Sequence, residues 1–115
     1  MASRGLNHLK LNVTDLEASV RFYSEAFGME VIDRSPSRAI LNTPGCHDTL
    51  TLGQTSDGEE PGFDHLGVFA DPAVDFEALV GRIEEAGGTL EGRSTLPNGR
   101  TTAFFRDPDG FRVQI

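Results

Sequence analysis

Alternating apolar and polar residues mark the first strand of this chain. The segment Gly5–Val13 reads GLNHLKLNV, which places His8, Lys10 and Asn12 on one face of a strand and apolar side chains on the other. A similar segment, GFDHLGVFA at Gly62–Ala70, begins the second half of the chain. The chain therefore contains an internal repeat. We expect its two copies to pack together, because one copy alone cannot bury its apolar face.

Each of these segments is followed by an amphipathic helix. In the first half, Thr14 and Glu17 form a capping-box pattern that predicts the start of a helix, and Gly28 suits its C-terminal cap. In the second half, Asp71 and Pro72 are expected to be the N-cap and the first helical residue. The apolar stripes at helical spacing are Leu16, Val20, Tyr23 and Phe27 in the first helix and Phe76, Leu79, Val80 and Ile83 in the second.

Three short strands follow each helix in the predicted order. They are residues 29–33, 38–42 and 48–53 in the first half and 89–93, 101–106 and 111–115 in the second. An acidic linker, 54–61, joins the halves. The expected fold is a single α+β domain, 1–115, of two βαβββ modules at about 5–53 and 62–115. The modules are expected to form a curved mixed sheet around a central cavity, with the helices outside.

Composition and charge narrow the range of partners. The 18 acidic residues outnumber the 10 basic ones, and the net charge of −8 disfavours nucleic acid and anionic membrane surfaces as partners. Cys46 is the only cysteine, which excludes an internal disulfide. No segment is apolar and long enough to act as a signal peptide or to span a bilayer. We therefore expect a cytoplasmic protein whose partner is a small molecule.

The same alternation predicts a binding site. If the helices cover the apolar faces of the sheet, the opposite faces line its cavity and carry polar side chains from four strands. These side chains are His8, His65, Thr49, Thr51, Arg112 and Gln114. Lys10 and Arg112 are candidates to meet an anionic ligand or to offset internal acids, and Phe69 and Phe104 are candidates for the apolar wall of a pocket. The two histidines either bind a metal or hydrogen-bond to neighbouring polar groups.

The sequence resembles the vicinal oxygen chelate superfamily over nearly its whole length. The resemblance rests on GLNHLKLNVTDLEASVRFYSEAFGMEV, DHLGVFA and FFRDPDGFRVQI. This superfamily includes glyoxalase I, fosfomycin-resistance transferases, bleomycin-resistance proteins and extradiol ring-cleaving dioxygenases. The resemblance implies a divalent metal, Fe(II), Mn(II), Ni(II) or Zn(II), bound at the positions of His8, His65 and Gln114. It also implies a homodimer, and it places Thr51 where glyoxalase I has a further ligand.

Gln114 departs from the pattern of this superfamily, in which a glutamate is usual. An amide oxygen can bind a metal but brings no negative charge, and neither Gln114 nor Thr51 can act as a carboxylate base. One hypothesis is a glyoxalase-like (lyase) or dioxygenase-like enzyme that uses a metal to act on a small oxygen-chelating or aromatic substrate. A second is a metal-free protein that binds a small drug, as bleomycin-resistance proteins do. A third is a component of a larger assembly that has no activity alone.

Overall fold

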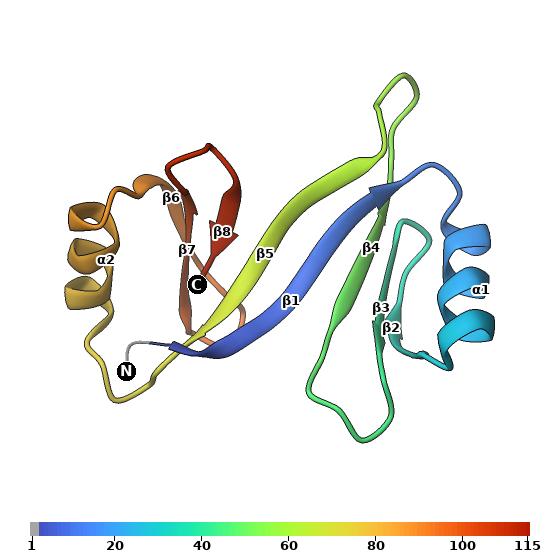
Figure 1. The fold of residues 1–115 in the computed structure, drawn as a ribbon, viewed down its shortest axis with the longest axis horizontal. Coiled ribbons are helices and arrows are strands. Elements are labelled where there is room, and N and C mark those ends of the chain that lie inside the picture. Colours follow the sequence, from blue (N-terminus) through green and yellow to red (C-terminus); the bar gives the residue numbers. More distant parts are fainter. Residues whose placement is uncertain (1–2) are drawn as a thin grey trace. The chain divides into compact units, whose positions relative to one another are not determined.

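The computed structural model describes residues 3–115, which form eight strands and two helices (Figure 1). The first half contains β1 (Ser3–Val13), α1 (Leu16–Phe27), β2 (Glu30–Arg34), β3 (Arg38–Asn42) and β4 (Leu50–Gln54). The second half contains β5 (Gly62–Ala70), α2 (Phe76–Glu85), β6 (Thr89–Thr95), β7 (Thr101–Arg106) and β8 (Arg112–Gln114). The predicted α+β class and the repeated βαβββ order are confirmed. None of the described helices is long and apolar enough to cross a membrane.

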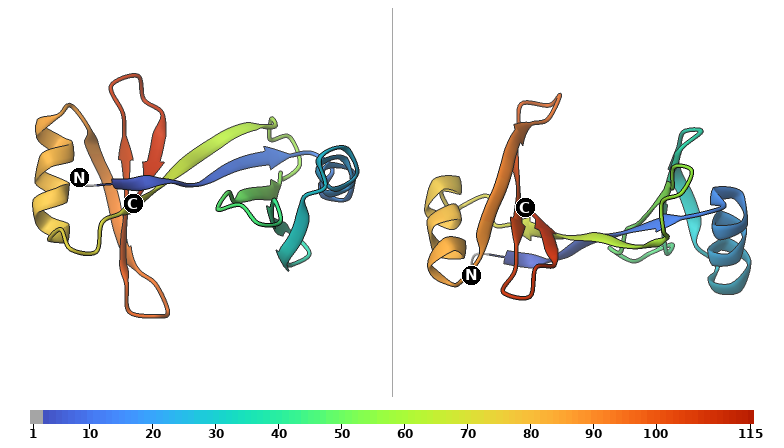
Figure 2. Two further views of the ribbon diagram at one scale, coloured as in Figure 1. Left: turned by 60° about the horizontal axis from the view of Figure 1, so that its bottom comes forward. Right: turned by 90° about the horizontal axis from the view of Figure 1, so that it is seen from above.

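The chain divides into two compact units. The first unit comprises residues 7–64, and the second comprises residues 3–6 together with 65–115. In the first unit, β2 and β3 are antiparallel, β3 and β4 are antiparallel, and β4 is parallel to β1. Helix α1 lies beside β2, β3 and β4 (Figure 2). The core of this unit consists of Leu16, Ala39, Leu41, Leu50 and Leu52, with Leu11, Val13, Val20, Tyr23 and Met29 packed against it.

The second unit repeats the strand pairing of the first. Strand β5 is parallel to β8, β8 is antiparallel to β7, and β7 is antiparallel to β6. Helix α2 covers one face of these strands, and the core consists of Val80, Ala103 and Phe105, with Phe76, Ile83, Leu90 and Ile115 packed against it. The predicted apolar stripe of the second helix therefore faces the core. Each unit keeps an apolar face under its helix and a polar face on the opposite side of its strands.

Both helices begin at a different residue from the one predicted. Asp15, not Thr14, caps α1, and its carboxylate accepts the backbone N–H three residues further on at 3.1 Å. The Thr14 carbonyl is instead held by the side-chain amide of Gln54 at 2.7 Å. Asp75 caps α2 in the same way, whereas Asp71 accepts an N–H of the preceding turn. In both cases the sequence offers two oxygen-bearing side chains, and tertiary contacts decide which one caps the helix.

The end of α1 confirms one prediction and corrects another. Gly28 adopts a left-handed conformation with φ of 71° and donates its N–H to Ser24, so it is the predicted C-terminal cap. Phe27 was expected in the core stripe but is 64% exposed. It is the last helical residue, it is not part of the core of this unit, and its ring packs edge-on against Phe22 with centroids 5.8 Å apart.

Candidate functional site

The polar face of the second unit carries two of the residues predicted as metal ligands, His65 and Gln114. Gln114 on β8 pairs with Gly67 on β5 and with Phe104 on β7. Residues paired across neighbouring strands project to the same side of a sheet. His65 lies two residues before Gly67, so its side chain is on that side as well. The strand register therefore places His65, Gln114 and Phe104 on one face, and the alternation predicted this for His65 and Gln114.

Phe104 contacts two polar side chains of this face. His65 is only 7% exposed, and its ring meets Phe104 edge to face, with centroids 5.3 Å apart. The guanidinium carbon of Arg112 lies over the same ring, 3.9 Å from its centroid. Aromatic pairs and cation–π contacts each contribute about 0.5–1.5 kcal/mol. Phe104 thus holds both the imidazole and the guanidinium in place. Phe69, the other predicted wall residue, has the same alternation as His65 and is 42% exposed.

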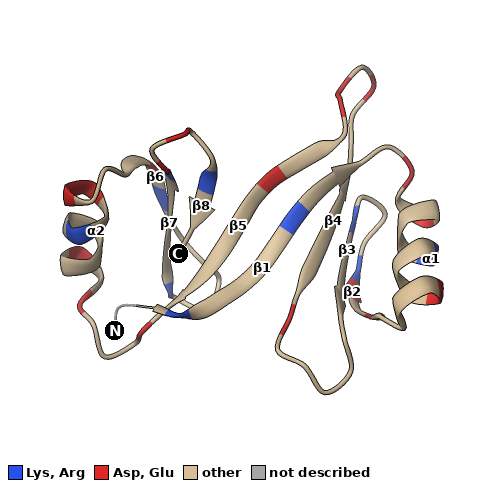
Figure 3. Ribbon diagram, in the orientation of Figure 1, with Lys and Arg blue, Asp and Glu red and all other residues tan. Residues whose placement is uncertain are grey.

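Arg112 belongs to a cluster of charges at one end of this face. Its Nε donates to Glu91 Oε1 at 2.9 Å, and Arg106 donates to the other oxygen of the same carboxylate. These hydrogen bonds, from Arg106 first and then Arg112, lower the pKa of Glu91. Basic and acidic positions both occur in the part of the second unit that contains β6, β7 and β8 (Figure 3). The two guanidinium groups and the carboxylate hold Arg112 at the edge of the polar face.

Gln114 is held by a short chain of hydrogen bonds. Its Nε2 donates to Thr102 Oγ1 at 3.0 Å, and the Thr102 hydroxyl donates to the Ile115 carbonyl at 2.6 Å. Neither Thr102 nor Glu91 was among the residues predicted for the site. Thr102 could have been found from alternation, since it precedes Phe104 by two residues on the same strand. Glu91 lies at an irregularity between β6 residues Leu90 and Gly92, which the sequence pattern does not reveal.

The polar face of the first unit repeats this arrangement. Lys10 on β1 pairs with Thr51 on β4, and His8 lies two residues before Lys10. This register matches that of the second unit, where the residue two positions after His65 pairs with Gln114. Thr51 is therefore the counterpart of Gln114 in the first unit, and it is 8% exposed. The Lys10 side chain crosses Gly53, where an added Cβ would come within 3.2 Å of the lysine Cε.

Each unit therefore supplies one imidazole and one neutral oxygen donor on its polar face. Within residues 3–115, no group of three or more His, Cys, Asp or Glu side chains is placed to hold a metal ion. Imidazole nitrogen together with amide or hydroxyl oxygen is still a donor set that suits Mn(II), Fe(II), Ni(II) and Zn(II). The donor atoms of these residues are therefore of a type that binds such an ion. Because all of them are neutral, they offset less of the ion's positive charge than a carboxylate would.

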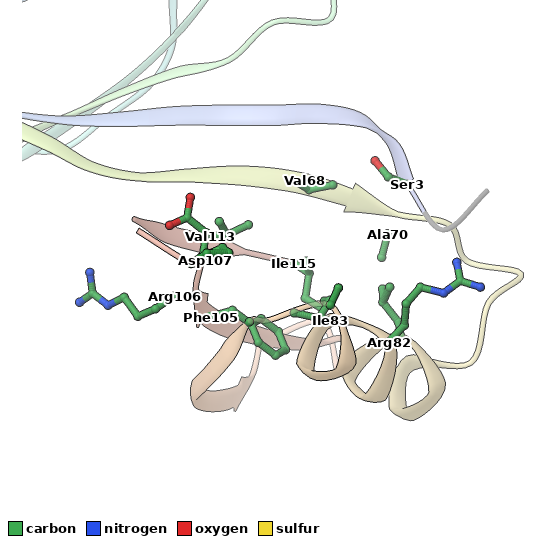
Figure 4. A pocket seen from close by; sticks show the side chains of 14 residues that line it. Ser3, Val68, Ala70, Arg82, Ile83, Phe105, Arg106, Asp107, Val113 and Ile115 are labelled. Atoms are coloured by element: carbon green, nitrogen blue, oxygen red, sulfur yellow. The ribbon is translucent and has the colours of Figure 1, made fainter. Parts of the chain in front are cut away.

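A pocket of about 380 Å³ lies on the opposite, apolar face of the second unit, between α2 and the strands (Figure 4). Its lining includes Val68 and Ala70 of β5, Ile83 of α2 and Ile115, and Arg82 stands at its rim. None of the residues predicted for the site lines this pocket. Its lining is mostly apolar, with Arg106 and Asp107 as further charged residues. Because it contains no predicted ligand, the polar face remains the candidate site.

Comparisons with known proteins identify the family of this chain. Residues 5–115 match the family model described as Glyoxalase/Bleomycin resistance protein/Dioxygenase superfamily. The chain is 37% identical to a trivalent organoarsenical cleaving enzyme of Bacillus sp. (strain MD1), over 70% of this chain and 50% of that protein. It is 30% identical to the glutathione transferase FosA of Serratia marcescens, over 97% and 79% of the two chains. The Mn(II)-bound glyoxalase of Novosphingobium aromaticivorans has a similar fold, with a TM-score of 0.81, 23% identity, and 98% and 38% of the two chains covered.

Proposed function

The chain belongs to the Glyoxalase/Bleomycin resistance protein/Dioxygenase superfamily, and on that premise we propose that it is a metal-dependent enzyme. His8, His65 and Gln114 bind one divalent ion in this proposal. A small substrate with adjacent oxygen atoms, or an aromatic one, completes the coordination. The organoarsenical relative is about twice as long as the part that matches, so its reaction is not carried over.

The repeated register carries this proposal. In the first unit, His8 lies two residues before Lys10, which pairs with Thr51 on the last strand. In the second unit, His65 lies two residues before Gly67, which pairs with Gln114 on the last strand. Two imidazoles at equivalent positions of the repeat, each on the polar face of its unit, supply two nitrogen donors of the kind that divalent transition metals prefer.

The residues around the second unit's face support binding and orientation of a substrate. A divalent ion, when bound, supplies Lewis-acid stabilisation of negative charge on a substrate oxygen. Phe104 contacts the His65 ring, and it also carries the Arg112 guanidinium, which Glu91 holds by a hydrogen bond. Gln114 and Thr51 are both neutral, so neither can take a proton from the substrate as a carboxylate base. The proposed reaction therefore depends on polarisation of the substrate and not on a base at these two positions.

We further propose that the chain acts as a cytoplasmic homodimer. Members of this superfamily often form dimers. Phe22 and Phe27 of the first unit are each more than half exposed and contact each other, so they form an exposed apolar pair of the kind that a partner surface can cover. Light scattering at high micromolar concentration should give twice the mass of one chain. A monomer at that concentration would contradict the proposed assembly.

A metal-free binding protein is the second candidate function. The observation that favours it is the lack of a carboxylate at either ligand position of the last strands, Thr51 and Gln114. In that case the same polar face binds a small drug directly, and Phe69 and Phe104 form the wall of the site. Charged and aromatic groups of the face would then supply the whole affinity.

Elemental analysis of protein purified without added metal or chelator distinguishes the two candidates. The wild-type protein should retain a divalent metal in near-stoichiometric amount, and His8→Ala and His65→Ala should each lose it. His47→Ala is the matched control, because His47 lies in an exposed turn, and it should retain the metal. Equal trace amounts in all four proteins would contradict the metal-dependent function and favour drug binding.

A further inference from the structure

Thr102 is a buried residue with a defined hydrogen-bonding role beside Gln114. It is 5% exposed and lies on β7, the strand that pairs with β8. Its hydroxyl donates to the Ile115 carbonyl at 2.6 Å and accepts from Gln114 Nε2 at 3.0 Å. Both contacts join neighbouring strands at the point where the candidate ligand is located.

The number of protons on Thr102 fixes the direction of these hydrogen bonds. A threonine hydroxyl carries one proton and can therefore donate only once. Because the Ile115 carbonyl can only accept, it takes that proton. Toward Gln114 the hydroxyl oxygen can then act only as an acceptor. Among the two ends of the Gln114 amide, only the NH₂ group can donate, so the NH₂ group is the end that faces Thr102.

The other end of the amide, Oε1, is left available for a ligand. No hydrogen bond to Gln114 Oε1 is found within the described part of the chain. No buried side-chain nitrogen or oxygen among these residues lacks a partner. Oε1 is therefore accessible, and it belongs to a side chain on the same face as His65. An amide rotated by half a turn would present its NH₂ group, which cannot bind a cation.

We propose that Thr102 is a positioning residue that presents Gln114 Oε1, and not the NH₂ group, to the metal. This inference rests on the proposed metal-dependent function and explains why a neutral side chain occupies the ligand position. A carboxylate at position 114 would have no N–H to give to Thr102. The arrangement of Thr102 and Ile115 is therefore adapted to an amide, so Gln114 is a ligand of the site in its own right.

Two substitutions of Thr102 separate this role from simple packing. Thr102→Val keeps the shape of the side chain but removes the hydroxyl, whereas Thr102→Ser keeps the hydroxyl. Affinity for Mn(II), measured by calorimetry, should fall about threefold to tenfold in Thr102→Val, the effect of one net hydrogen bond. In Thr102→Ser it should stay close to the wild-type value. In a Gln114→Ala background, Thr102→Val should cause no further loss.

A second readout needs no metal. The side-chain NH₂ resonances of Gln114 in an ¹⁵N-labelled protein should move in Thr102→Val and remain in place in Thr102→Ser. Unchanged resonances and unchanged Mn(II) affinity in Thr102→Val would overturn the inference. An equal loss of affinity with and without Gln114 would also overturn it, because Thr102 would then act through another group. If the wild-type protein binds no Mn(II) at all, the proposed function itself fails, which is a different result from metal binding that ignores Thr102.

Discussion

Replacing Gln114 with glutamate should have opposite effects on stability and on metal affinity. The carboxylate of Gln114→Glu cannot donate to Thr102, whose proton is already used by the Ile115 carbonyl at 2.6 Å. One hydrogen bond is lost and two acceptor oxygens face each other in a half-buried position. We expect the metal-free variant to lose about 1–2 kcal/mol of its free energy of unfolding at pH 7.

The pH dependence of this loss follows from the same contact. A protonated carboxyl group can donate to Thr102, so the folded state favours protonation and raises the pKa of the introduced glutamate above its value in the unfolded chain. The hydrogen bond from the protonated carboxyl group contributes fully to the free energy of unfolding when the pH is below the unfolded-state pKa of the glutamate. This contribution is lost as the pH rises through the folded-state pKa. Urea denaturation should therefore show the variant close to wild type near pH 4 and less stable at pH 7.

Metal affinity should change in the other direction. The substitution adds a full negative charge near the ion, and two opposite unit charges about 4 Å apart attract by roughly 1–4 kcal/mol at a partly buried site. Calorimetric titration of Gln114→Glu with Mn(II) should show correspondingly tighter binding. Gln54→Glu is the matched control, since the Gln54 amide also donates a hydrogen bond, to Thr14, away from the candidate site. It should lose stability without any change in metal affinity. A Gln114→Glu variant with wild-type stability at pH 7 and wild-type affinity would refute this reasoning.

Three further outcomes follow from the described contacts. The hydrogen bonds from Arg106 and Arg112 lower the pKa of Glu91, so these ion pairs contribute stability that is lost as pH falls through the lowered pKa. Arg112→Gln should raise the titration midpoint of Glu91 in an NMR experiment, and an unchanged midpoint would contradict the role given to Arg112. Leu41 is fully buried, and Leu41→Ala should cost about 2–5 kcal/mol in urea denaturation, while Leu6→Ala, at a position 72% exposed, should cost little. Gly28 has a φ of 71°, so Gly28→Ala should destabilise the protein by about 1 kcal/mol, and a stabilised variant would show that the cap is not required.

The internal repeat made most of the fold predictable. The alternation in Gly5–Val13 and Gly62–Ala70 identified two equivalent strands, and the helical spacing after each of them identified α1 and α2. Alternation also placed His65, Arg112 and Gln114 on one face, because the side-chain period of a strand does not depend on tertiary contacts. The register of β8 with β5 and β7 then brought these residues together in the structure.

Features that depend on contacts between distant segments could not be predicted. The start of α1 is one such feature, because Gln54, from the end of β4, binds both the Thr14 carbonyl and the Leu16 N–H. Phe27 has the spacing of a core residue, but it is exposed and its ring packs against Phe22. Thr102 and Glu91 acquire their roles only through partners on neighbouring strands. Local sequence patterns carry no information about such partners.

Paramagnetic broadening by Mn(II) is the most direct test of the central claim that His8, His65 and Gln114 bind one divalent ion. Mn(II) is added in small steps to ¹⁵N-labelled protein while the imidazole and side-chain amide resonances are followed. The account predicts that the resonances of all three side chains disappear together at low metal concentration, while those of the exposed His47 persist. Early loss of the His47 resonances, with His8, His65 and Gln114 unaffected, would show that these three residues do not form the metal site.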